Sequence, residues 1–248
     1  MNTSNPVLSN NVFSQFGYGT RSDSMTMQGT VVKTFVLLLC AMLTAGYTWI
    51  KFFQSGANPD SVTTLMWVGV LGGFALAIVT TFKKEWAPVT SIFYALFEGL
   101  FIGALSAILE HQFKGIAIQA AGLTFGVLFT MLAVYQAGWI QVTDKFRFGV
   151  VAATGGIALF YIISLGLSFF GIQIPYLFGN GLIGIGFSVL VVGLAALNLV
   201  LDFDFIEKGV RANVPKYMEW YGAFALMVTL VWLYIEVLRL LSKLRSRD

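Results

Sequence analysis

The sequence predicts an all-α integral membrane protein, a bundle of seven transmembrane helices. Hydrophobic residues make up 57% of the 248 residues and charged residues only 11%, whereas a soluble domain averages roughly 25% charged residues. This composition excludes a soluble globular domain and an intrinsically disordered chain. Strands of a membrane β-barrel would be ~10 residues long with alternating polarity, and no segment shows that alternation. The apolar segments are therefore expected to cross the membrane as helices.

The sequence contains seven apolar stretches, separated by charged or Pro-, Gly- and Asn-rich breaks. Each reaches the roughly 20 residues that a helix needs to cross the hydrocarbon. The predicted spans are residues 34–53, 62–82, 87–109, 115–139, 147–170, 180–201 and 221–241. The first span lacks the pattern of a cleaved signal peptide, so we expect it to act as the targeting signal itself. We predict one membrane domain, 31–244, between a polar N-terminal arm, 1–30, and a short basic tail, 245–248.

Basic residues set the predicted orientation. Lysines and arginines concentrate in the N-terminal arm and in the loops on its side, whereas the opposite loops hold only Lys51 and Lys114. The positive-inside rule then places the N-terminus in the cytoplasm. The tail residues Lys243, Arg245 and Arg247 break this pattern. A re-entrant last segment would remove the conflict, so it stays open as the alternative to a full seventh crossing.

Pairs of glycines four residues apart mark helix faces where two backbones can approach closely. Three such pairs occur in the predicted spans: Gly69/Gly73, Gly99/Gly103 and Gly122/Gly126. They predict close packing within a compact bundle.

The sequence offers little for enzymatic chemistry, so we predict a protein that is not an enzyme and needs no cofactor. The single cysteine, Cys40, allows no intramolecular disulfide, and the single histidine, His111, excludes a multi-histidine metal centre. His111 follows Glu110 in a short loop, but no nucleophile accompanies this pair. The net charge of +3 fits basic loops attracted to anionic lipid headgroups and gives no support for a nucleic-acid partner.

Three acidic residues lie within the predicted spans, where an ionisable side chain costs a few kcal/mol and is a functional candidate by default. Glu98 lies in the middle of the third span, Asp202 at the end of the sixth and Glu236 deep in the seventh. We interpret Glu98 as an ion-path or proton site. The structural alternative is a neutral carboxyl that hydrogen-bonds a polar side chain of a neighbouring helix, such as Asn198.

Asp202 and Glu236 are predicted to face each other. They lie 34 residues apart, so an antiparallel hairpin that turns around residue 219 places them opposite. Two carboxyls in low-dielectric surroundings cannot both ionise cheaply and can share one proton near neutrality, which makes the pair a pH sensor. The alternative for Glu236 is an i,i+3 ion pair with Arg239. Asp204 and Glu207, at the polar end of the hairpin, are expected to be solvated.

Three runs of the sequence resemble a known family. They are FEGLFIGALSAIL in the third span, LDFDFIEKG at the end of the sixth and LYIEVLRLLSKL in the seventh. With the seven spans, they make residues 30–244 similar to a bacterial form of the Bax inhibitor-1 family, also called transmembrane Bax inhibitor motif proteins. Asp202 with Ile206 fits the family's Asp followed by a short polar stretch with Ile. Glu236 takes the second acidic position, where many relatives have Asp.

The resemblance implies six helices around a central last helix, and a pH-sensitive calcium leak in a bacterial inner membrane. It assigns Asp202 and Glu236 as the gate and as a transient calcium site, to which Asn198 could add an oxygen. Calcium is then the transported ion, and weak binding suits a leak. Other bacterial relatives resemble modulators of a membrane-bound AAA protease. A regulatory protein that binds such a protease through the arm 1–30 is therefore the alternative.

Overall fold

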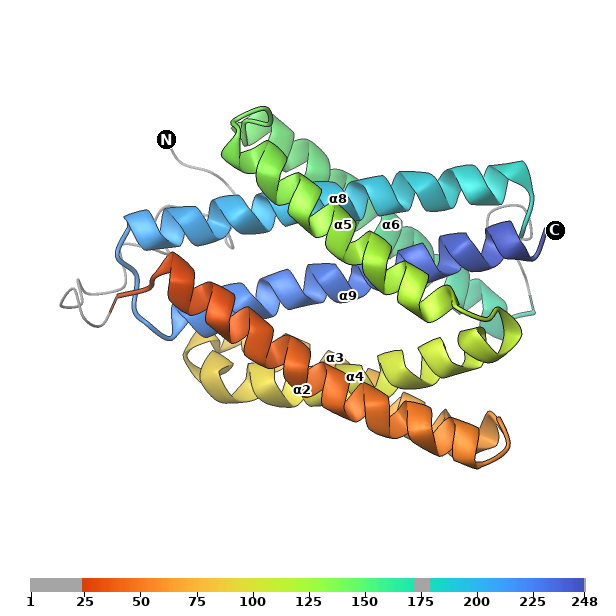
Figure 1. Ribbon diagram of the computed structural model, residues 1–248. Helices are drawn as coiled ribbons and strands as arrows, with labels where there is room; N and C mark the ends of the chain where they lie inside the picture. Colours follow the sequence, from red (N-terminus) through yellow and green to blue (C-terminus); the bar gives the residue numbers. More distant parts are fainter. Residues whose placement is uncertain (1–23, 172–178, 248) are drawn as a thin grey trace.

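Seven long α-helices make up most of the computed structural model, which describes residues 24–171 and 179–247. The helices are α2 (Met27–Gln54), α3 (Asp60–Phe82), α4 (Ala87–Gln112), α5 (Ile116–Gln136), α6 (Asp144–Phe169), α8 (Leu182–Arg211) and α9 (Met218–Arg245), with a 3-10 turn, η1 (Lys84–Trp86), before α4. Each of the seven is long and apolar enough to cross a membrane. The predicted all-α bundle of seven spanning helices is confirmed (Figure 1).

The helices extend beyond the predicted spans where their charged ends are paired. α8 continues to Arg211 instead of ending at 201. Two i,i+4 ion pairs stabilise this extension: Asp204 with Lys208 at 2.8 Å and Glu207 with Arg211 at 2.5 Å. α9 is one unbroken helix of 28 residues, the geometry of a full crossing rather than of a re-entrant segment.

The last helix, α9, forms the centre of the bundle, as the family resemblance implies. Its spanning window is 50% buried, whereas that of α6 is only 6% buried. It packs against α2, α4, α5 and α8, through core residues such as Met227, Leu233 and Leu238. α3 instead packs mainly against α4 on the outside. We call the end of the bundle where α2 and α9 begin the proximal end, and the opposite end the distal end (Figure 1).

Two of the three predicted glycine pairs make close helix contacts. Gly69 and Gly73 of α3 face α4, and Gly99 of α4 faces the backbone of Ala41 in α2. The close approach explains why α4 is packed tightly between α2 and α3. The third pair, Gly122 and Gly126 of α5, has no heavy atom of the described residues within 4 Å of an added Cβ. The prediction fails there because α5 turns this face outward.

A buried ion pair fastens the start of α2 to the start of α9. The fully buried Glu219 carboxyl accepts hydrogen bonds from the Thr26 N–H and hydroxyl, at 2.9 and 2.8 Å, and pairs with Lys33. A Cβ on Gly29 would overlap this carboxyl, so glycine gives it room. We call these four residues the proximal clasp. The last residues of the predicted arm 1–30 therefore belong to α2, which begins at Met27. Residues 1–23 of the arm lie outside the described residues.

Gly99→Ala should destabilise the bundle, because the new methyl group would overlap Thr44 Oγ1 and the Ala41 backbone. Overpacking of this kind costs about 1–3 kcal/mol. The measurement is the thermal unfolding midpoint in detergent. Gly126→Ala is the matched control, since its methyl group meets open space and its midpoint should not fall. Equal midpoints for the two variants would contradict the assigned packing.

Lys33→Met should destabilise the protein because it leaves the Glu219 carboxylate buried without its cation. Removing one partner of a buried pair costs about 3–5 kcal/mol, and we expect the lower end because the Lys33 side chain is 17% exposed. The double variant Lys33→Met/Glu219→Gln should recover part of the loss. Unfolding midpoints in detergent test this, with Lys51→Met, at the far end of α2, as the control. A Lys33→Met midpoint no lower than that of Lys51→Met would refute the clasp.

Candidate functional site

Polar side chains repeat every seven residues on α6 and again on α9. Seven residues are close to two helical turns, so each row stays on one face with a drift of ~20°. The rows face polar residues of α8. Together these side chains form what we call the polar seam: Arg147, Thr154 and Tyr161 of α6; Ser188, Asn198, Asp202 and Asp204 of α8; and Thr229, Glu236, Arg239 and Lys243 of α9.

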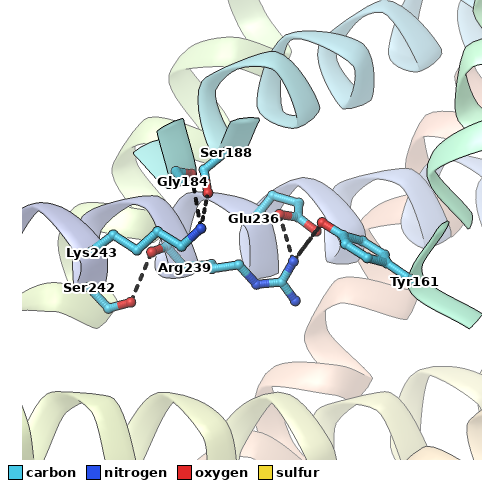
Figure 2. Close-up of polar contacts among 7 residues, drawn as sticks. All are labelled: Tyr161, Gly184, Ser188, Glu236, Arg239, Ser242 and Lys243. Atoms are coloured by element: carbon cyan, nitrogen blue, oxygen red, sulfur yellow. Dashed lines mark hydrogen bonds and ion pairs between the residues drawn. The ribbon is translucent and has the colours of Figure 1, made fainter. Parts of the chain in front are cut away.

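At its distal end the seam holds a hydrogen-bonded cluster around Glu236. The Glu236 side chain is 1% exposed. Tyr161 donates to its Oε1 at 3.0 Å, and Arg239 Nη1 donates to its two oxygens at 2.9 and 3.1 Å. The same guanidinium nitrogen donates to Tyr161 Oη at 2.7 Å. Figure 2 shows the three side chains converging from α6 and α9. The cluster neutralises a carboxylate that would otherwise be isolated within the bundle.

Lys243 lies one turn beyond Arg239 and is also buried. Its side chain reaches α8, where Nζ donates to Gly184 O and Ser188 Oγ, both at 3.0 Å (Figure 2). The predicted conflict with the positive-inside rule is therefore reduced, because this lysine is packed between helices and is not a loop charge. The distal end of the seam carries two cations, Arg239 and Lys243, and one acid, Glu236.

The middle of the seam is polar with few charges. Asn198 Nδ2 donates to Thr154 Oγ1 of α6 at 2.8 Å and to Leu194 O at 2.9 Å. One turn further, the Asp202 carboxyl lies beside the Thr229 hydroxyl of α9, which donates to Ala225 O of its own helix. Its second carboxyl oxygen, Oδ2, is buried and has no hydrogen-bond partner among the described residues. An unsatisfied buried oxygen is costly, so this atom marks the position in the seam that is most in need of a proton, water or cation.

At the proximal end the acids belong to ion pairs. Asp204 is 8% exposed and accepts from Arg147 of α6 at 2.6 Å and from Lys208 at 2.8 Å. Glu207 pairs with Arg211 and hydrogen-bonds Tyr135 of α5. The expectation that Asp204 is solvated is wrong. Its partner Arg147 lies 57 residues away, and only the seven-residue row on α6 could have indicated it.

Asp202 and Glu236 do not face each other directly. Lys243 contacts Ser188 and Asp202 contacts Thr229, so Glu236 lies seven residues beyond the position opposite Asp202, about 10 Å along α9. The hairpin turns between Arg211 and Met218, before the predicted residue 219, which shifts the register. No ion pair or hydrogen bond joins the two carboxyls among the described contacts. Glu236 instead forms the i,i+3 pair with Arg239.

Glu98 lies outside the seam, at the contact between α4 and α3. A Cβ on Gly73 of α3 would lie 3.1 Å from Glu98 Oε1, so the glycine leaves space for the carboxyl. Tyr94, one turn earlier on α4, hydrogen-bonds Glu98. The structure therefore supplies a local partner instead of Asn198. Glu98 remains a spanning acid, but the structure separates it from the other three predicted residues.

The seam presents its acids singly and in different layers. Ca²⁺ takes six to eight oxygen ligands, and no group of three or more His, Cys, Asp or Glu residues within the described chain could hold a metal ion. Its three carboxyls, those of Asp202, Asp204 and Glu236, instead lie at different positions along the seam.

Comparisons with known proteins identify the family. Neither the curated proteins nor the solved structures include a match. The sequence model of the family described as Bax inhibitor 1 like matches residues 5–246, which is nearly the whole chain and includes every residue of the polar seam. The protein therefore belongs to the Bax inhibitor 1 like family of membrane proteins.

Proposed function

We propose that the protein is a pH-sensitive calcium leak and that the polar seam is its ion path. The observation that carries this proposal is Asp202, whose Oδ2 is buried within the bundle with no hydrogen-bond partner among the described residues. A purely structural acid would have its oxygens satisfied, as those of Glu236 are. An acid held with one free oxygen is suited to bind a proton or a cation transiently.

The charges along the seam support a closed resting state. A cation that approaches from the proximal end meets Asp204, which is already paired with Arg147 and Lys208, and then Asp202. Further along it meets Arg239, which is hydrogen-bonded to Glu236, and then the buried Lys243. Like charges repel strongly where water is scarce. On this account, flux requires the Arg239 guanidinium to leave Glu236 so that its carboxylate becomes available to the ion.

Protons and cations compete for the same carboxylate oxygens, which is the source of the proposed pH sensitivity. A proton on Asp202 removes the charge that attracts a cation to the middle of the seam. A proton on Glu236 weakens its pair with Arg239 and so loosens the distal cluster. The two acids act at separate layers about 10 Å apart along α9, so the sensor consists of two single sites and not of one shared pair.

The alternative is a regulatory protein without transport activity that binds a membrane-bound AAA protease. Its candidate contact is the arm 1–30, of which residues 1–23 lie outside the described residues. This role requires neither a path through the bundle nor an acid with a free oxygen. A passive channel is also distinct from an enzyme, which we do not propose.

Asp202→Asn should remove the part of the pH dependence of calcium flux in proteoliposomes that arises in the middle of the seam. Asn has nearly the shape of a protonated Asp and no charge, so the variant should keep only the pH response that Glu236 supplies. Glu236→Gln should change the profile separately, because it weakens the pair with Arg239. Glu98→Gln, a spanning acid outside the seam, is the matched control and should keep the native profile. A native profile in Asp202→Asn would overturn the assignment, and absence of native flux would favour the regulatory role.

A further inference from the structure

We propose that a groove between α2, α5 and α8 binds one acyl chain of an anionic phospholipid, with the phosphate at Lys208 and Arg211. The groove has a volume of about 650 Å³, within the roughly 300–1,000 Å³ of ligand sites in proteins. Its walls include Phe35 of α2 and Phe129 of α5, which are 60% and 62% exposed. It is separate from the polar seam apart from Asp204, which borders both.

The length of the groove matches one leaflet of a bilayer. Along α5 it runs from Gln136 to Phe125, which is eleven residues or about 16 Å. That distance is about half of the ~30 Å thickness of the hydrocarbon. The groove therefore begins at the proximal interface and ends near the midplane, as the acyl chain of a phospholipid does.

The groove is amphipathic along its length. Tyr135, Gln136, Gln141 and two acids lie at the proximal end, whereas Leu38 and Phe125 line the midplane end. Hydroxyl and amide groups at the interface can hydrogen-bond the glycerol and ester oxygens of a lipid. The apolar end can receive only a hydrocarbon chain. The occupant must therefore have a polar headgroup and a long apolar tail in that order.

The charge at the groove's polar end selects an anionic headgroup. The two acids on its wall, Asp204 and Glu207, are paired with three cations: Arg147, Lys208 and Arg211. One positive charge is therefore left over. Lys208 and Arg211 do not line the groove, but their ion pairs with Asp204 and Glu207 place them at its rim, and their side chains are 47% and 75% exposed. Basic positions between transmembrane helices are a known mode of binding for anionic headgroups.

The test measures binding of single lipids to the full-length, delipidated protein by native mass spectrometry. Phosphatidylglycerol should bind roughly tenfold more tightly than phosphatidylcholine with the same chains. The variant Lys208→Gln/Arg211→Gln should lose this preference, because it should weaken binding of phosphatidylglycerol more than binding of phosphatidylcholine. Lys51→Gln, a cation at the distal end of α2, is the control and should keep the preference. Higher salt should weaken the phosphatidylglycerol preference of the native protein.

Leu132→Trp tests the apolar part of the groove. The larger side chain should displace the acyl chain and weaken the binding of both lipids at least tenfold. Leu165→Trp, on the exposed face of α6, is its matched control.

Equal binding of the two lipids to the native protein would overturn the proposal, as would unchanged binding to Leu132→Trp. Association of two protein copies through the groove in place of lipid would also overturn it. If Leu132→Trp does not fold, the rim variants still decide. Because no flux is measured, these outcomes are independent of the proposed calcium leak.

Discussion

The arrangement of the bundle depends on one constraint: a charged side chain in the hydrocarbon must find its partner within the protein. α9 carries Glu236 and Lys243 two turns apart on one face. Besides Arg239 of α9 itself, polar partners for these charges come from α6 and α8, where Tyr161 hydrogen-bonds Glu236 and Ser188 hydrogen-bonds Lys243. Surrounding α9 with other helices is therefore the arrangement that keeps these charges from lipid. The same burial makes the last helix the centre of the fold.

This constraint also connects structure to the proposed activity. At both ends of the polar seam, carboxylates are neutralised by arginine or lysine, so those layers are stable and closed. The layer of Asp202 differs because, among the described residues, no cation pairs with this carboxyl and Oδ2 has no hydrogen-bond partner. A proton or a passing cation can complete that layer. In the proposed leak, the interactions that stabilise the seam also block it, and the layer where they are incomplete is the sensitive one.

The sequence predicts the spans well, because the thickness of the membrane sets the length of the apolar stretch that each spanning helix needs. It predicts the partners of the charges poorly, because these depend on register and on distant helices. The predicted hairpin turn lies a few residues too late in the chain, which places Glu236 opposite Asp202. In the structure Thr229 lies opposite Asp202. The buried state of Asp204 and Glu219 depends on Arg147 and Lys33, which are far away in the chain. The seven-residue rows on α6 and α9 are visible in the sequence, but three of their members, Thr154, Tyr161 and Thr229, carry no charge to draw attention to them.

The most direct test of the seam as a water-accessible path is the reactivity of a cysteine placed within it. In a Cys40→Ala background, Thr154→Cys should react with a small cationic thiol reagent in proteoliposomes, because a thiolate forms only where water or a cation reaches it. Leu159→Cys, 58% exposed on the same helix, faces the predicted lipid side and should react far more slowly. Calcium should slow the labelling of Thr154→Cys. Equal, slow labelling of both cysteines would contradict a path between α6, α8 and α9.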